Sequence, residues 1–131
     1  MKLLLDTNVV VWLLLNQRRS VPHDVADALS SPSASVLVSA ASVWEIAIKR
    51  SLGKLRIDES WHRTLMGLDL EHLPVSAEHA SGVEALPWHH RDPFDRLLVA
   101  QACAEDAVLV TADRTLDAYP AATWWGGPMS G

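Results

Sequence analysis

Several short stretches of the chain are apolar at every position and end at a polar residue. Runs of this kind are typical of strands buried on both faces, as in a parallel sheet covered by helices. The clearest runs are Leu3–Leu5, Val36–Val38 and Val108–Val110, and weaker signals predict a strand around Leu73 and Val75 and an edge strand from Ala122 to Trp124.

Between these strands, apolar residues recur at helical spacing and helix-starting residues precede them. Proline near a helix start, as at Pro22 and Pro93, suits the first turn. The predicted helices run from Thr7 or Asn8 to Leu15, from Val21 to Leu29, from Ala40 to Leu52, from a cap at Asp58 to about Met66, onward from a cap at Ser76, and from Asp92-Pro93 to about Glu105.

The alternation of strands and helices predicts an α/β fold with a mostly parallel central sheet flanked by helices, an α/β/α sandwich. A chain of 131 residues fits a single domain. We assign residues 1–125 to this domain and expect residues 126–131, which are rich in Gly and Pro, to form a flexible tail.

Four acidic residues fall where this topology would gather them. Asp6 closes the first strand, Glu45 lies early in the helix after the second, Asp95 lies in the first turn of the last long helix, and Asp113 follows the third apolar run. In a parallel sheet, carboxyl ends of strands and amino ends of the following helices share one edge, where ligands usually bind.

Grouped carboxylates repel one another unless a cation lies between them, and oxygen ligands suit Mg²⁺ or Mn²⁺. Such a cation can activate a water molecule and neutralise charge on a phosphodiester, so that no nucleophilic side chain is needed. The pattern therefore indicates a metal-dependent hydrolytic site.

Each acid also has a structural alternative. Asp6 can serve as a plain N-cap of the helix that follows it. Glu45 can complete a capping box with Ser42, which has the S-x-x-E spacing.

Asp92 and Asp95 both stand at the start of the last long helix. The position of Asp92 fits the cap of this helix, which favours Asp95 as the ligand, although the pair leaves the choice open. Asp113 can be a turn residue.

Composition limits the function in several ways. The formal charge of −5 weighs against binding nucleic acid by charge alone, although the four acids account for most of the excess negative charge.

The six histidines show no zinc-like spacing, and Cys103 is expected to be core filler. Asp6 and neighbouring polar residues interrupt the apolar N-terminus, so we expect a cytoplasmic protein without a signal peptide or membrane span.

Basic and aromatic residues suggest further contacts. Arg91, Arg96 and Arg114 fall near the acidic edge and can hold phosphates, or Arg96 can pair with Asp92 on the helix. A second basic cluster is read as a solvated helix end rather than an RNA track, and it contains Lys49, Arg50, Lys54 and Arg56.

The six tryptophans are read as core or interface residues. We expect some of them, Trp124 and Trp125 in particular, to line a dimer or antitoxin surface together with Val9–Leu15.

Four segments in order resemble the acidic motifs of the PIN-domain family. They are residues 4–8 (LLDTN), 39–45 (SAASVWE), 92–100 (DPFDRLLVA) and 110–113 (VTAD). The chain is similar to VapC toxins of type II toxin–antitoxin modules.

The resemblance implies a Mg²⁺- or Mn²⁺-dependent endoribonuclease that cuts tRNA or ribosomal RNA, forms a homodimer and is inhibited by a VapB-type antitoxin. It assigns Asp6, Glu45, Asp95 and Asp113 to the catalytic metal site. Residues expected to support this site or to bind phosphate are Thr7, Asn8, Thr111, Asp92, Arg96 and Arg114.

Two other classes compete with the nuclease. A Mg²⁺-dependent phosphatase or phosphoryl-receiver domain also places an aspartate at a strand end, but no second early aspartate follows Asp6. In a non-catalytic protein-interaction module, the acids would be helix caps and the apolar surfaces would carry the function.

Overall fold

A computed structural model, described here for residues 1–128, contains a five-stranded sheet in which every pairing is parallel. The strand order is β3-β2-β1-β4-β5. This confirms the predicted α/β class. The strands are β1 (Lys2–Leu5), β2 (Ser35–Ser39), β3 (Glu71–Leu73), β4 (Val108–Val110) and β5 (Thr123–Trp124).

The chain reverses direction across the sheet at β1. From this central strand it moves outward through β2 to β3, and then returns to the other side of β1 to form β4 and β5. Leu5 of β1 lies in register with Val110 of β4, and Asp6 N–H donates to the Val110 carbonyl at 3.0 Å. The carboxyl ends of β1 and β4 therefore form a topological switch point, the usual binding crevice of such sheets.

A helix occurs at each of the six predicted places. The helices are α1 (Thr7–Leu14), α2 (His23–Leu29), α3 (Ala40–Ser51), α4 (Trp61–Met66), α5 (Ala77–Gly82) and α6 (Pro93–Glu105). Three short 3₁₀ turns, η1 (Arg18–Ser20), η2 (Val83–Ala85) and η3 (Arg114–Ala118), were not predicted, because three to five residues carry too little periodicity.

The predicted cap of α4 at Asp58 is wrong. The helix starts after Ser60, and the Asp58 carboxylate instead accepts hydrogen bonds from the backbone N–H and the hydroxyl of Ser60. Asp58 thus closes a local turn with Ser60, the residue directly before the helix.

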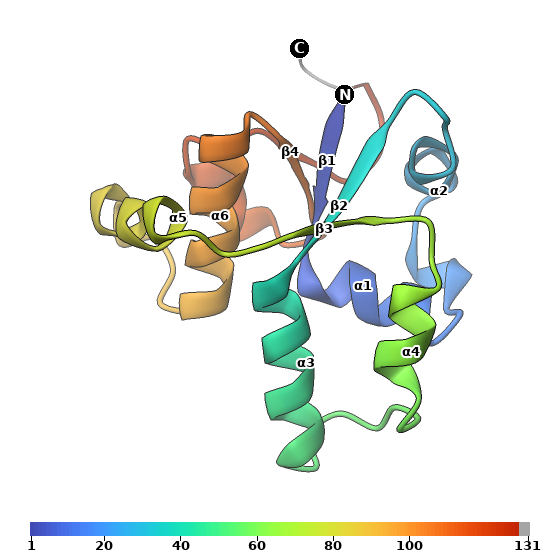
Figure 1. The fold of residues 1–131 in the computed structure, drawn as a ribbon. Helices are drawn as coiled ribbons and strands as arrows, with labels where there is room; N and C mark the ends of the chain where they lie inside the picture. The colour runs from blue at the N-terminus through green and yellow to red at the C-terminus, as the bar shows by residue number, and fades with distance from the viewer. Residues whose placement is uncertain (129–131) are drawn as a thin grey trace.

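Alternate residues of β1 supply the two halves of the core. Leu3 and Leu5 pack in one cluster with Val9 and Val10 of α1, whereas Leu4 joins a second cluster with Leu98 of α6. Successive strand residues point to opposite faces, so one apolar run serves both layers. Figure 1 shows α5 and α6 on one side of the sheet and α1, α2 and α4 on the other, which gives the predicted sandwich.

Two expectations about apolar residues are corrected here. Val9, Val10 and Trp124 are buried in the core, so they do not line a surface. Trp125 packs partly buried against Trp12, with ring centroids 5.6 Å apart. The edge strand β5 pairs with β4, and the residues after it contact Trp12 of α1 and Asp24 of α2, which gives the two C-terminal tryptophans a place in the domain.

Cys103 is exposed, not core filler. The buried arc of α6 includes Val99 and Ala102, and Cys103 lies outside that arc. Its neighbours in the sequence are small and apolar, which made the two sides of the helix hard to distinguish.

The first part of the predicted tail contacts the domain. Trp124 Nε1 donates to the Gly127 carbonyl at 2.9 Å, and Gly127 N–H donates to the Asp24 carboxylate. Gly126 has a φ of +100°, and a Cβ there would lie 2.9 Å from Asp24 Oδ1, so this close approach requires glycine. Residues 129–131 lie outside the described part of the chain.

No helix in the described residues is both long enough and apolar enough to cross a membrane.

Candidate metal centre

Asp6 sits at the carboxyl end of β1 and is buried. Its backbone occupies the N-cap position of α1, but its side chain makes no capping hydrogen bond. Instead, Thr111 Oγ1 donates to Asp6 Oδ2 at 2.7 Å and accepts from the Asp113 N–H at 3.0 Å. The interpretation of Asp6 as a plain N-cap is therefore wrong. The Thr111 hydroxyl links Asp6, at the end of β1, to Asp113, which follows β4.

Glu45 lies in α3 and is also buried. The capping box with Ser42 does not form, because α3 begins at Ala40 and is capped by Ser39, whose Oγ accepts from Ala41 N–H at 3.0 Å. Ser42 lies inside the helix, where its hydroxyl contacts Thr7 Oγ1 at 2.9 Å. Sequence spacing alone placed the cap three residues too late.

The two oxygens of Glu45 have different surroundings. Oε2 forms an ion pair with Lys49 Nζ at 2.7 Å, one turn further along α3. Oε1 is buried without a hydrogen-bond partner among the described residues. A buried acceptor left unpaired is costly, so this oxygen fits a group that binds a cation.

Asp92 and Asp95 divide two roles at the start of α6. Asp92 Oδ1 caps the helix by accepting from Phe94 N–H at 2.8 Å and from Asp95 N–H at 3.2 Å. The Asp95 side chain is 17% exposed and turns toward the other acids. Asp95 therefore remains the candidate ligand, and Asp92 holds the helix that carries it.

Asp113 combines the two interpretations proposed for it. Its Oδ1 caps η3 by accepting from Thr115 N–H at 3.0 Å and from Thr115 Oγ1 at 2.6 Å. The Thr115 hydroxyl hydrogen bond is the main reason that the pKa of Asp113 is lowered. The second oxygen, Oδ2, faces the site.

Electrostatic coupling shows that these carboxylates share one region. Burial, followed in order of size by the charges of Asp6, Asp92, Glu45 and Asp113, raises the pKa of Asp95 to about 7. Burial likewise raises the pKa of Asp6, against the hydrogen bond from Thr111 and with added repulsion from Glu45 and Asp113. Crowded carboxylates of this kind favour a bound cation or proton.

His90 is a member of this cluster that the sequence did not identify. Its Nε2 lies 3.5 Å from Asp95 Oδ2 and 3.6 Å from Asp113 Oδ2. One potential ligand atom of each of these residues lies within 4.8 Å of the others. The only sequence signal was its place two residues before the cap Asp92, in a segment with no regular pattern.

Arg96 occupies a different place from the predicted phosphate site. It is 2% exposed, and its guanidinium donates to the carbonyls of Pro87 at 2.8 Å and Val83 at 3.1 Å. It also donates to Leu86 O and Tyr119 Oη, and it lies 3.8 Å from the centre of the Trp88 ring. These internal acceptors use its donors, so Arg96 anchors a loop and does not reach a phosphate.

The other predicted supporting residues differ in exposure. Thr7 and Thr111 are buried beside the acids, whereas Asn8 is exposed at the start of α1. Arg114 is 80% exposed in its side chain and pairs with Asp117 at 3.7 Å, and Arg91 is exposed as well. Arg91 and Arg114 are therefore the arginines that remain accessible next to the cluster.

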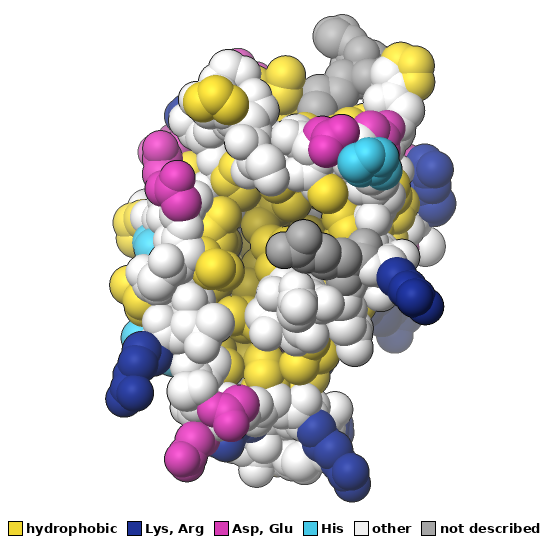
Figure 2. Space-filling view, turned by 90° about the vertical axis from the view of Figure 1, so that its right-hand side faces the viewer, with side chains coloured by type: hydrophobic (Ala, Val, Ile, Leu, Met, Phe, Trp, Pro, Cys, Tyr) yellow, Lys and Arg dark blue, Asp and Glu magenta, His cyan; other side chains and the backbone are white. Residues whose placement is uncertain are grey.

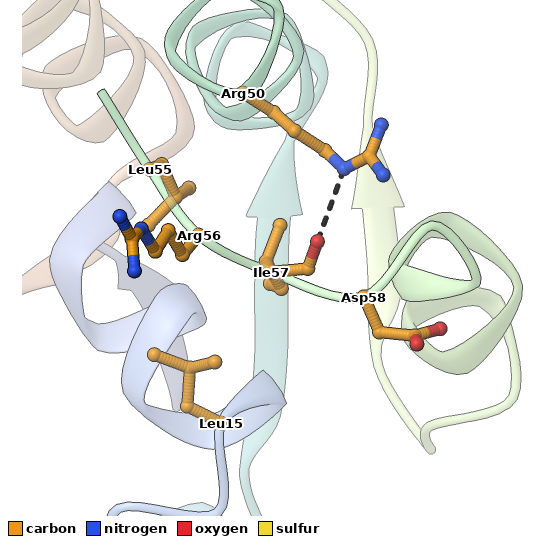
Figure 3. A pocket seen from close by; sticks show the side chains of 6 residues that line it. All are labelled: Leu15, Arg50, Leu55, Arg56, Ile57 and Asp58. Carbon is orange, nitrogen blue, oxygen red and sulfur yellow. Dashed lines mark hydrogen bonds between the residues drawn. The ribbon is translucent and has the colours of Figure 1, made fainter. Parts of the chain in front are cut away.

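The second basic cluster spans the last turn of α3 and the loop that follows it. Arg50 Nε donates to the Ile57 carbonyl at 3.1 Å and so fixes the following loop (Figure 3). This loop and Leu15, the residue directly after α1, surround an open hollow of about 620 Å³. Because Lys49 pairs with Glu45 and Arg50 holds the loop, the cluster is better explained by structure than by an RNA track.

A family comparison agrees with this geometry. Residues 3–122 match the model of the PIN domain family, which is nearly the whole chain, and the chain belongs to this family. A search of curated proteins finds no match.

Solved structures share the fold across most of their length. VapBC2 from Rickettsia felis, bound to a DNA fragment from its promoter, matches with a TM-score of 0.73 and 19% identity, over 95% of this chain and 98% of that one. VapBC-1 from nontypeable Haemophilus influenzae matches with a TM-score of 0.68 and 19% identity, over 95% and 97%. A toxin–antitoxin complex from Klebsiella pneumoniae matches with a TM-score of 0.59 and 20% identity, over 89% and 92%.

The raised pKa of Asp95 predicts how stability changes with pH when metal is removed. The folded chain holds the Asp95 proton more tightly than the unfolded chain, in which the aspartate pKa is near its ordinary value of 3.8. The free energy of unfolding therefore falls as pH rises from about 4 through about 7. Asp95→Asn removes this loss and should stabilise the protein at pH 8 by on the order of 1–2 kcal/mol, after allowance for solvent screening.

Urea unfolding in chelator at pH 8 and pH 4 measures this difference. The two proteins should converge near pH 4, where folded Asp95 is protonated. Equal stability at pH 8 would contradict the crowding of carboxylates around Asp95.

Proposed function

We propose that this chain is a Mg²⁺- or Mn²⁺-dependent endoribonuclease that acts as the toxin of a type II toxin–antitoxin module. The observation that carries the proposal is the crowding of Asp6, Glu45, Asp95 and Asp113 at the switch point, with Glu45 Oε1 buried and unpaired. Such a group of oxygen ligands suits a hard divalent cation.

Asp6, Glu45 and Asp95 are the proposed ligands, with Asp113 at the open side. When bound, the cation supplies positive charge to the phosphodiester and lowers the pKa of the attacking water. Thr111 holds the Asp6 carboxylate by a 2.7 Å hydrogen bond, and Lys49 holds Oε2 of Glu45. The contact with Lys49 leaves Oε1 of Glu45 available to the cation.

The proposed substrate is RNA, with tRNA or ribosomal RNA as the expected targets, cut in the cytoplasm. The motifs that resemble VapC toxins support this choice, since the acidic site by itself would suit any phosphodiester. Arg91 and Arg114 are accessible beside the cluster and offer charge to backbone phosphates.

A VapB-type antitoxin is the proposed partner, and an apolar hollow offers it a place. The hollow has a volume of about 700 Å³ and is lined by residues of α1, α2 and β2, including Trp12, Leu29 and Val36. Figure 2 shows hydrophobic side chains gathered in a hollow across this face. An amphipathic helix of the antitoxin would bury them.

Toxin activity gives a prediction in cells. Expression of the wild-type chain should arrest growth, whereas Asp6→Asn should not, because it lacks one carboxylate of the metal site. Co-expression of the small protein encoded next to this chain should restore growth. Arrest by both variants at equal protein levels would contradict the nuclease as the source of toxicity.

Homodimer formation is the next prediction. Trp44 and Ile48 of α3 and Leu52, the residue that caps its carboxyl end, are spaced at i, i+4 and i+8. Trp44 and Leu52 are 60% and 62% exposed. Sedimentation velocity should show a dimer at micromolar concentration, and Trp44→Asp should shift it toward monomer. A wild-type monomer under these conditions would contradict the proposal.

Cleavage of RNA is the central test of function. Asp6→Asn is nearly isosteric but removes a charge, so the fold should survive while cleavage falls by about 100-fold or more. The measurement compares cleavage of tRNA and ribosomal RNA with Mg²⁺, with Mn²⁺ and with chelator. Asp27→Asn, an exposed change on α2, is the matched control and should cleave as wild type does.

Equal cleavage by wild type and Asp6→Asn would overturn the mechanism. A wild-type chain that binds metal but cuts no RNA would instead favour a protein-interaction role.

A further inference from the structure

The backbone of His90 forms two hydrogen bonds with the hydroxyl of Tyr119. Its backbone N–H donates to Tyr119 Oη at 2.8 Å, and the Tyr119 hydroxyl lies 3.3 Å from the His90 carbonyl. Arg96 donates to the same Tyr119 oxygen at 3.2 Å and to the Pro87 carbonyl at 2.8 Å. The buried guanidinium thus fixes the loop that carries His90, although it is remote from any phosphate.

The ring of His90 is fixed as well. Asp92 N–H donates to His90 Nδ1 at 3.1 Å. An N–H donor requires a lone pair on Nδ1, so the hydrogen of the neutral imidazole must lie on Nε2. The sequence places this donor two residues after the ring that accepts it.

The Nε2 hydrogen faces two carboxylates. Asp95 Oδ2 lies 3.5 Å from Nε2 and Asp113 Oδ2 lies 3.6 Å from it. Asp95 lies in α6, whereas Asp113 follows β4, so the two carboxylates belong to different elements of the fold. The imidazole nitrogen therefore lies within ion-pair distance of both carboxylates.

We infer that His90 is a positioning residue of the proposed metal centre: its Nε2–H orients the carboxylates of Asp95 and Asp113, and His90 does not itself bind the cation. A metal-binding imidazole must offer a lone pair, and Nε2 has none while Nδ1 accepts from Asp92. The inference rests on the proposed function, since it concerns the ligands of that site.

This role has a measurable consequence. Hydrogen bonds that orient ligand carboxylates commonly contribute about 10- to 100-fold to metal affinity or activity. Loss of the Nε2–H should therefore weaken metal binding even in the absence of RNA.

Two amide substitutions test the roles of the two ring nitrogens, Nε2 and Nδ1, separately. His90→Gln extends an amide N–H about as far as Nε2, so it can still reach Asp95 and Asp113. His90→Asn ends near the position of Nδ1, so it can still accept from Asp92 N–H but cannot reach the carboxylates. His72→Asn, an exposed change on β3, is the control.

The experiment measures Mn²⁺ binding by calorimetry for these variants, with thermal unfolding to check that each one folds. We expect His90→Gln to stay within about 3-fold of wild type and His90→Asn to lose about 10- to 100-fold in affinity. Rescue by Gln and not by Asn is a result that a merely structural role of the loop would not give.

A second measurement reads the ring directly. Two-bond ¹H–¹⁵N spectra of the wild-type histidines should show His90 with its hydrogen on Nε2, both without metal and with Mg²⁺. Loss of that hydrogen on addition of Mg²⁺ would mean that His90 is a ligand, and it would overturn the inference.

The outcomes distinguish this inference from the proposed function. Equal Mn²⁺ affinity of wild type and His90→Asn overturns the positioning role and leaves the nuclease standing. Weak binding by His90→Asn with rescue by His90→Gln, but no RNA cleavage by wild type, supports the role and overturns the nuclease. A wild-type chain that binds no Mn²⁺ overturns both.

Discussion

The parallel pairing of β1 with β4 is the constraint on which the rest of the structure depends. Leu5 lies beside Val110, and Asp6 N–H extends this ladder by donating to the Val110 carbonyl. One residue further, Thr111 Oγ1 joins Asp6 to the backbone of Asp113. Two segments more than a hundred residues apart thereby end at one point. The helices α3 and α6 then add Glu45 and Asp95 to it from their amino-terminal halves.

Placing several carboxylates at one point carries an energetic cost that the fold accepts. Burial and mutual repulsion raise the pKa of Asp95 to about 7, and the pKa of Asp6 is raised as well. The protein offsets part of this cost with fixed donors from Thr111 and Lys49. The remaining repulsion between the carboxylates is relieved when a cation binds, and this relief favours cation binding. Crowded acids of this kind are typical of functional sites, where local stability is traded for chemistry.

The fold and the four acids were accessible from the sequence because each rests on a local signal. Apolar triplets marked β1, β2 and β4, and strand-end or helix-start positions marked Asp6 and Asp95. The caps were less certain: spacing proposed a box of Ser42 and Glu45, whereas the helix starts three residues earlier at Ser39. His90 and Arg96 were misjudged for another reason. Their roles depend on Tyr119 and on a loop around Pro87, and these partners share no periodic relation with them.

The sequence by itself determined the order of elements, the parallel sheet and the family, because strand burial, helix periodicity and motif order are written along the chain. Only the tertiary structure decided which carboxylate oxygens accept hydrogen bonds within the protein and which do not. One oxygen of Asp92 accepts hydrogen bonds from its helix, and one buried oxygen of Glu45 has no hydrogen-bond partner. One oxygen of Asp113 accepts hydrogen bonds in a turn, and the other faces the site. The reason is physical: a side chain's hydrogen-bond partners are set by what packs against it in space, and those neighbours come from distant parts of the chain.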